Sequence, residues 1–330
     1  MTDVKRLYFF EAFTLANLIL AALLLHRSLP LAAPLFNVLA FASGLAMQAL
    51  AGIAVRCAIA AARRDHAYLR IIRRRAWIAD TLRLIAAGSF AVFTYGWIKL
   101  VVPLYHPTLF DQTLWDLDRA LFFGLSPNVF FLDLFNGALR AFDWSYAMIF
   151  YVSTIVAFAY FLSHPSRRIR AAFANGNCVL WIAGAWLYFL VPSVGPAFRF
   201  PDLWLVHEQA LARTQELQAL LMRNYQNVLR AGAGEPVTRR IQLVFGIGAF
   251  PSLHVAFQMY VFLWMRRLFT AGEVLFGLFV AIIFLGSMIT GWHYLIDGLC
   301  GVALALACYK IPWRAARMPR FLELFSSAWH

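Results

Sequence analysis

The chain has 330 residues, of which 62% are hydrophobic and 14% are charged, and its mean hydropathy is +0.68. This balance excludes an ordinary soluble domain and indicates a polytopic helical membrane protein. The net charge of +13 does not indicate nucleic-acid binding, because the arginines lie in short clusters between apolar segments, as expected of cytoplasmic loops. We therefore expect membrane lipids with anionic headgroups, and no nucleic acid, as partners.

Apolar segments approach the roughly 20 residues needed to span a bilayer at eight points along the chain. In order, they cover residues 7–25, 35–62, 82–104, 145–162, 171–191, 252–268, 274–289 and 293–309. The first segment is long for a signal peptide and has no small-residue cleavage site before Arg27, so we interpret it as an uncleaved span. The sequence thus predicts an all-α protein with about eight transmembrane helices, the first two being an N-terminal addition.

Two longer polar stretches interrupt these spans, at 105–144 and 192–248. In the first, residues 129–142 carry apolar residues at helical spacing, which predicts either an amphipathic helix in the membrane interface or an ordinary helix packed on the bundle. In the second, residues 217–229 carry an apolar stripe that ends at Gly232-Ala233-Gly234. We interpret this stripe as an interfacial helix covering a site, with a plain surface helix as the alternative.

Alternation of eight spans places every basic cluster on one side of the membrane. These clusters lie at 63–75, 167–170, 266–267 and 310–320, and the positive-inside rule makes that side cytoplasmic. Both termini are then cytoplasmic, and both polar stretches face the periplasmic or extracellular side. We expect the protein to be located in the bacterial inner (plasma) membrane. The four cysteines lack the spacing of a metal site.

Polar, reactive residues stand at the first turns of two late spans. His293 and Asp297 are four residues apart and share a helix face, so the carboxylate can accept the Nδ1 proton and leave Nε2 as a base or nucleophile. Pro251-Ser252-Leu253-His254 resembles a capped helix start, where the helix dipole attracts anions and a histidine can donate a proton. Each pattern alone also fits a purely structural contact.

Together, the two patterns supply a nucleophile, an orienting carboxylate, a general acid and an anion cradle. These are the parts of a phosphoryl transfer through a phosphohistidine. No acidic cluster has the spacing needed to hold a metal, so we expect neither a metal nor a cofactor.

Pro251-Ser252-x-His254 with His293-x-x-x-Asp297 resembles the second and third motifs of the type 2 phosphatidic acid phosphatase superfamily. Phe250–His254, His293–Gly298 and Val191–Ala197 more closely resemble the branch containing fungal inositol phosphorylceramide synthase, and the similarity covers about 111–307. It implies a catalytic six-helix membrane domain at 81–310, after two helices and a basic loop at 1–80 and before a basic tail at 311–330. It also implies His293 as nucleophile, Asp297 as its partner and His254 as acid and base.

The chain departs from the phosphatase pattern at its cationic residues. The third-motif arginine, six residues before the histidine, is replaced by Ser287, and the first-motif Lys-x6-Arg-Pro is absent. Our first candidate for binding the phosphate is therefore Arg199, followed by Lys99, Arg119 and Arg140. Ser252, Gly195 and Pro196 complete the expected phosphate and substrate site.

We expect a lipid phosphotransferase that moves a phosphoryl headgroup, such as phosphoinositol, from a phospholipid donor to a hydroxyl acceptor on a lipid or polyol. The acceptor would make this an enzyme of phospholipid or sphingolipid metabolism. A lipid phosphatase acting on phosphatidate or polyprenyl phosphates, and a non-catalytic lipid-binding or transport protein, are the alternatives. The sequence does not identify protein partners.

Overall fold

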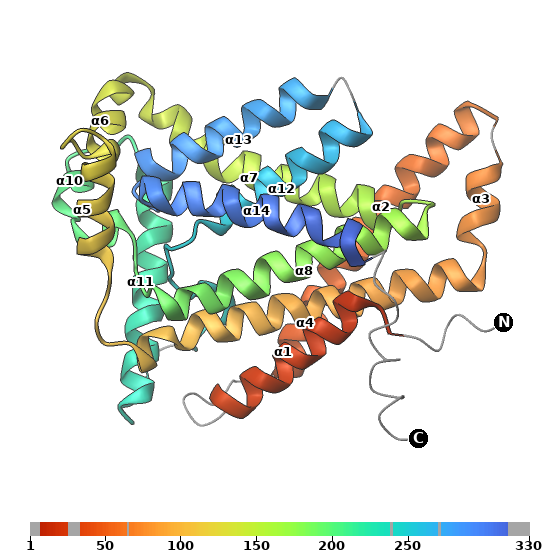
Figure 1. The fold of residues 1–330 in the computed structure, drawn as a ribbon, viewed down its shortest axis with the longest axis horizontal. Helices are drawn as coiled ribbons and strands as arrows, with labels where there is room; N and C mark the ends of the chain where they lie inside the picture. The colour runs from red at the N-terminus through yellow and green to blue at the C-terminus, as the bar shows by residue number, and fades with distance from the viewer. Residues whose placement is uncertain (1–6, 26–33, 65, 238–239, 270–271, 316–330) are drawn as a thin grey trace.

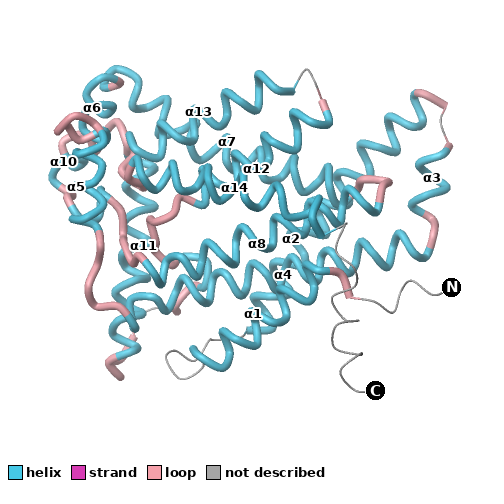
Figure 2. The backbone as a smooth tube through the Cα atoms, viewed as in Figure 1, coloured by secondary structure: helices cyan, strands magenta, loops and turns pink. Residues whose placement is uncertain are grey.

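The computed structural model describes residues 7–25, 34–64, 66–237, 240–269 and 272–315. Within these ranges the regular structure is helical and no strand occurs, which confirms the all-α prediction (Figure 2). The long helices are α1 (Phe9–Leu25), α2 (Pro34–Ala62), α4 (Arg75–Tyr105), α7 (Leu139–Leu162), α8 (Arg167–Leu190), α12 (Leu253–Leu268), α13 (Gly272–Ile289) and α14 (Leu295–Ala315). Of the described helices, α2, α4, α7, α8 and α13 are each long and apolar enough to cross a membrane alone. The chain is a polytopic membrane protein.

Helix α4 begins earlier than its apolar segment predicts. Helix α4 starts at Arg75 and not near residue 82, because the charged residues of its first turns have partners inside the protein. Asp80 accepts a hydrogen bond of 2.7 Å from the Tyr8 hydroxyl, and Arg83 forms an ion pair of 2.5 Å with Glu11. Paired charges extend a helix past the end of its apolar segment, which hydropathy alone does not reveal.

The first two helices pack directly on the others. Helix α1 lies against α4 and α8, and α2 lies against α4 and α7. Gly52 of α2 allows close approach: a Cβ there would lie 2.0 Å from the carbonyl oxygen of Ala159 on α7. The division into an N-terminal pair at 1–80 and a catalytic domain at 81–310 stays a prediction.

Helix α12 lies at the centre of the bundle. It packs against α7, α8, α13 and α14, and its Phe257, Tyr260 and Trp264 are buried in an aromatic core. Helices α12 and α14 approach each other closely at Gly301, where a Cβ would lie 2.5 Å from the carbonyl oxygen of Ser252. This close approach brings the first turns of the two helices together.

The two ends of the bundle are formed by different parts of the chain (Figure 1). One end carries α3 (Ala67–Ile72) and the α7–α8 and α12–α13 connections, where the basic clusters lie. The other end carries α5 (Asp111–Leu121), α6 (Pro127–Leu134), α9 (Pro196–Arg199), α10 (Asp202–Leu205) and α11 (Ala212–Gly232), which we call the cap layer. The described basic clusters and the cap layer thus lie at opposite ends of the bundle, and the assignment of either end to the cytoplasm stays a prediction. Of the predicted tail at 311–330, residues 316–330 lie outside the described part.

The two predicted amphipathic helices have different outcomes. Residues 129–142 do not form one helix: α6 ends at Leu134, a 3-10 turn covers Asn136–Ala138, and α7 begins at Leu139. Asn136-Gly137 interrupts the helix, because both residues have low helix propensity. Residues 217–229 do lie in one helix, α11, which ends at Gly232 as predicted and packs on α4 and α7.

Candidate active site

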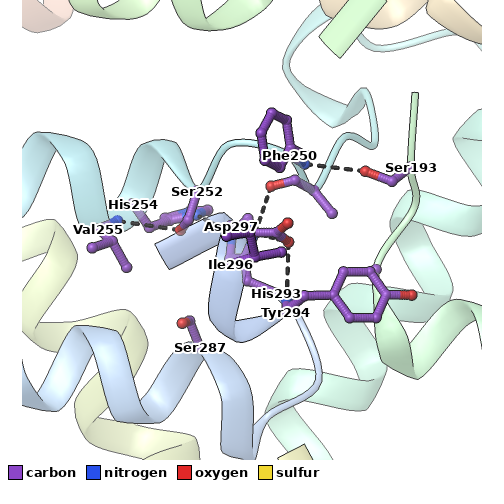
Figure 3. A network of polar contacts seen from close by, with 12 residues as sticks. Ser193, Phe250, Ser252, His254, Val255, Ser287, His293, Tyr294, Ile296 and Asp297 are labelled. Carbon is purple, nitrogen blue, oxygen red and sulfur yellow. Dashed lines mark hydrogen bonds and ion pairs between the residues drawn. The ribbon is translucent and has the colours of Figure 1, made fainter. Parts of the chain in front are cut away.

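Two histidines meet where α12 and α14 begin (Figure 3). The Ser252 hydroxyl accepts a hydrogen bond of 3.3 Å from the Val255 N–H and so caps α12, as its sequence context predicted. The Ser252 N–H donates to the Asp297 carbonyl at 3.0 Å, which ties the two helix starts together. As a result, Nδ1 of His254 lies 3.4 Å from Nε2 of His293.

The ring of His293 has a defined orientation. Its Nδ1 lies 2.8 Å from the carbonyl oxygen of Ala249 and 3.5 Å from a carboxylate oxygen of Asp297. A carbonyl can only accept, so Nδ1 carries the proton and the neutral ring has its lone pair on Nε2. That lone pair faces His254, whose Nδ1 is then the donor in the pair.

Asp297 lies beside the nucleophile candidate, as predicted, but the two residues do not share a helix face, because α14 begins at Leu295, after His293. Asp297 is fully buried, and its Oδ2 accepts a hydrogen bond of 2.9 Å from the Tyr294 N–H. Its Oδ1 has no hydrogen-bond partner among the described residues. The closer partner of the His293 ring is nevertheless the Ala249 carbonyl, a main-chain group that a sequence pattern does not single out.

Residues 191–197, which we call the Pro-rich segment after Pro192 and Pro196, support the chain that leads to His254 and His293. Ser193 forms two hydrogen bonds to the segment before α12. Its carbonyl accepts from the Ala249 N–H at 3.0 Å, and its hydroxyl accepts from the Phe250 N–H at 3.1 Å. Gly195 has a φ of 106°, and a Cβ there would lie 2.5 Å from the Trp292 carbonyl oxygen. Its N–H donates to Asp111 at 2.8 Å. The N–H of Gly195, a candidate for the phosphate site, therefore already donates its hydrogen bond to a side chain of the protein.

The remaining substrate-binding candidates lie in different surroundings. Pro196 is buried at the start of α9, whereas Arg199 at its end is exposed, with its guanidinium 5.5 Å from the Phe200 ring centroid. Lys99 of α4 donates to the Tyr95 hydroxyl at 3.3 Å and lies 5.3 Å from the Tyr188 ring centroid. The Tyr188 ring packs against Gly248, next to Ala249, so Lys99 lies near the segment that orients His293. Tyr95 and Tyr188 were not among the sequence candidates.

The cap layer donates hydrogen bonds to the main chain of residues 288–293. In the last turn of α13, the Met288 carbonyl accepts from Asn128 on α6 and the Ile289 carbonyl accepts from Trp204 on α10. After α13, the Thr290 carbonyl accepts from Gln218 on α11, the Gly291 carbonyl from the Ala197 N–H on α9, and the His293 carbonyl from Asn128, and all five bonds are between 2.9 and 3.0 Å. Helix α11 thus anchors this segment through Gln218, and its covering of the site stays a prediction. Sequence reasoning missed these donors, whose only signal was a polar residue in apolar surroundings.

Asp118 of α5 caps the start of α14. Its two carboxylate oxygens accept hydrogen bonds from the Leu295 N–H at 2.6 Å and the Ile296 N–H at 2.9 Å. Burial raises the pKa of Asp118 to about 6, although these two bonds oppose the shift. A negative side chain at a helix start also interacts favourably with the helix dipole.

Ser287, which stands where the phosphatase pattern has arginine, is buried and bonded within its own helix. The Ser287 hydroxyl donates to the Phe284 carbonyl at 2.7 Å within α13, and the side chain is buried. Gly286 packs against the Tyr146 ring, where a Cβ would lie 3.0 Å from Cδ2. In the described part of the chain, no three His, Cys, Asp or Glu side chains gather in a way that could hold a metal ion.

A cleft of about 480 Å³ lies between α9–α10 and α11. Its walls include Phe198, Trp204, Glu208, Glu216 and Met222. Trp204 and Ala197, which also lines the cleft, pack against Gly291, so the cleft shares a wall with the loop that carries His293.

Comparison with known proteins gives one finding. The family model described as the PAP2 superfamily matches residues 112–311. The matched range contains His254, His293 and Asp297, whereas Lys99 and Asp111 precede it. The match supports the superfamily expected from the motifs and identifies no branch within it. No curated protein and no solved structure matches the chain.

Proposed function

This chain belongs to the PAP2 superfamily, and we propose that it is a membrane lipid phosphotransferase that works through a phosphohistidine on His293. Superfamily membership gives it a function of the lipid phosphatase or phosphotransferase type. One observation carries the finer proposal. Because Nδ1 of His293 bonds the Ala249 carbonyl, the lone pair of the ring is on Nε2, and this atom lies 3.4 Å from Nδ1 of His254. A nucleophile and a proton donor are thus adjacent.

In the first half-reaction, Nε2 of His293 attacks the phosphorus of the lipid donor. A nitrogen–phosphorus bond forms while the bond between phosphorus and the leaving oxygen breaks. His254 enters protonated at both ring nitrogens and gives its Nδ1 proton to the leaving oxygen. Lys99 and the capped start of α12 stabilise the negative phosphoryl oxygens, which is the main contribution of a protein to phosphoryl transfer.

In the second half-reaction, the now neutral His254 takes the proton of an acceptor hydroxyl. The acceptor oxygen attacks phosphorus, the nitrogen–phosphorus bond breaks, and His293 returns to its starting state. A lipid or polyol acceptor gives a new phospholipid, and water gives a phosphatase. The 480 Å³ cleft beside the His293 loop supports a hydroxylated acceptor, because it offers room for a small polar molecule.

The runner-up is a lipid phosphate phosphatase, which superfamily membership equally permits. The missing arginine at Ser287 favours transfer over this alternative. Our proposal further includes a donor such as phosphatidylinositol, no metal requirement, and a location in a bacterial inner membrane. Both termini would be cytoplasmic and the site would face the periplasm, as the basic clusters at the opposite end of the bundle suggest.

The test uses purified protein in detergent with a phospholipid donor radiolabelled in its phosphate, with and without inositol, diacylglycerol or ceramide, in buffer containing EDTA. An acceptor-dependent new phospholipid would support the transferase if it is lost in His293→Ala and kept in His207→Ala, which changes a residue in the turn after α10. Acceptor-independent free phosphate from a monoester donor would support the phosphatase. Lipid binding without turnover would support the non-catalytic alternative. Label on protein at the wild-type level in His293→Ala would contradict the nucleophile assignment.

A further inference from the structure

Two buried polar residues of the cap layer lie behind the nucleophile candidate and touch neither histidine ring. We infer that Asp111 on α5 and Asn128 on α6 are positioning residues for His293, an inference that rests on the proposed function of His293 as nucleophile. Asp111 precedes the range matched by the family model, and neither residue was a candidate from the sequence.

Asp111 joins two segments that are far apart in the chain. Its carboxylate is fully buried and accepts hydrogen bonds from the Tyr294 hydroxyl at 2.8 Å, the Gly195 N–H at 2.8 Å and the Val194 N–H at 3.1 Å. Burial raises the pKa of Asp111, and the bonds from Gly195 and Val194 oppose that shift. A buried carboxylate is costly unless donors surround it, so three donors at one carboxylate fix the spacing of both segments.

Asp111 acts on His293 from two directions. On one side it holds Tyr294, the residue that directly follows His293. On the other side it holds Val194 and Gly195, whose neighbour Ser193 holds Ala249, and the Ala249 carbonyl orients the His293 ring. Hydrogen bonds joined by short pieces of main chain therefore connect Asp111 to Nδ1 of His293.

Asn128 fixes the main chain of the same residue. Its fully buried amide donates one hydrogen to the Met288 carbonyl at 3.0 Å and the other to the His293 carbonyl at 2.9 Å. The two bonds span the turn between α13 and His293. An aspartate at position 128 would set a carboxylate against two carbonyl groups, which repel it.

Precise placement matters for the reaction because a reacting atom displaced by about 1 Å can lose roughly 100-fold in rate. We expect Asp111→Asn and Asn128→Asp to lower kcat about 10- to 100-fold while KM changes less than about threefold. The loss falls on kcat because neither side chain contacts the phosphoryl group in the proposed mechanism, and both act on the placement of His293. Asp111→Glu, which restores the charge with a longer side chain, should recover part of the rate.

The chain offers matched controls on the same two elements. Asp116→Asn changes an exposed carboxylate of α5 whose hydrogen-bond partner is Gln112, and Asn136→Asp changes an exposed residue just after α6. Both should keep wild-type kcat. If Asp111→Asn does not fold, Tyr294→Phe removes a single bond to Asp111 and should still lower kcat about 3- to 10-fold, a loss of roughly 1 kcal/mol.

A second readout separates this inference from the proposed function. The rate at which diethylpyrocarbonate modifies His293, followed by mass spectrometry, reports the setting of the ring whether or not the protein turns over lipid. We expect Asp111→Asn to change that rate at least threefold and Asp116→Asn to leave it unchanged. Wild-type protein without turnover but with this difference would refute the proposed function alone. Equal kcat and equal His293 reactivity in Asp111→Asn and Asp116→Asn would refute the positioning role.

Discussion

The carbonyl oxygen of Ala249 lies 2.8 Å from Nδ1 of His293, whereas the carboxylate of Asp297 lies 3.5 Å from the same atom. The main chain is therefore the closer partner of the ring, and the carboxylate is the second. In hydrolytic triads the carboxylate itself sets the histidine tautomer. Here a neutral carbonyl sets it, and Asp297 chiefly holds the Tyr294 N–H.

This relationship predicts a modest role for the carboxylate. Asp297→Asn should lower kcat only about tenfold, or roughly 1.4 kcal/mol of transition-state stabilisation, because its amide oxygen can still accept from Tyr294. His293→Ala should abolish the phosphoenzyme entirely. Steady-state kinetics and acid-quenched labelling of the two variants measure the difference. A loss with Asp297→Asn as complete as that with His293→Ala would mean that the carboxylate sets the tautomer after all.

Lys99 and Arg199 give a second prediction. Sequence reasoning placed Arg199 before Lys99, and both stay candidates. We expect Lys99 to have the larger effect, because it lies beside Tyr188, which packs against Gly248 next to Ala249, whereas Arg199 is exposed on α9. Lys99→Gln should lower kcat/KM by roughly 100-fold, the usual effect of removing one donor to a developing oxyanion. Arg199→Gln should stay within about threefold of wild type. The reverse order of losses in the same assay would restore Arg199 as the phosphate ligand.

The sequence predicted those site residues that belong to short local motifs. His254, His293 and Asp297 were predicted and lie together because each motif is local and stands at a helix start. Ala249 and Asn128 were not predicted, because a main-chain carbonyl leaves no mark in the sequence and a single buried asparagine has no periodicity. Their roles arise from contacts between distant segments.

For the fold, the sequence predicted the long helices but misplaced some of their ends. Apolar length gave every long helix, yet α4 begins earlier than hydropathy indicates because Asp80 and Arg83 are paired with residues near α1. The stripe at 129–142 kept helical spacing across a break at Asn136, so its period alone could not locate the end of α6.

Gly195 provides a third prediction, on the packing of the Pro-rich segment. Its φ of 106° and ψ of 159° lie in a region open almost only to glycine, and a Cβ would meet the Trp292 carbonyl oxygen at 2.5 Å. Gly195→Ala should destabilise the protein by about 2 kcal/mol or more and lower activity, since Trp292 is next to His293. Thermal unfolding in detergent measures this loss. The control is Gly137→Ala, where a Cβ meets nothing within 4 Å and stability should be unchanged.

His164 gives the last prediction, at the opposite end of the bundle between α7 and α8. Burial lowers the pKa of His164 to about 4, and the charge of Arg56 acts in the same direction. Its Nδ1 accepts a hydrogen bond of 3.0 Å from the Ser166 N–H, which requires the neutral ring. The ordinary histidine value of about 6.5 applies to the unfolded chain, which therefore takes up a proton at higher pH than the folded protein does.

The contribution of His164 to stability is consequently full above pH 6.5, falls as the pH is lowered from about 6.5 to about 4, and is level below that. The melting temperature in detergent should decrease over this interval in wild type. His164→Asn can keep an acceptor for the Ser166 N–H but has no proton to gain, so its melting temperature should decrease less. Because other groups also titrate there, the decisive quantity is the difference between the two curves. Parallel curves from pH 7 to pH 4 would show that His164 is not held neutral by the fold.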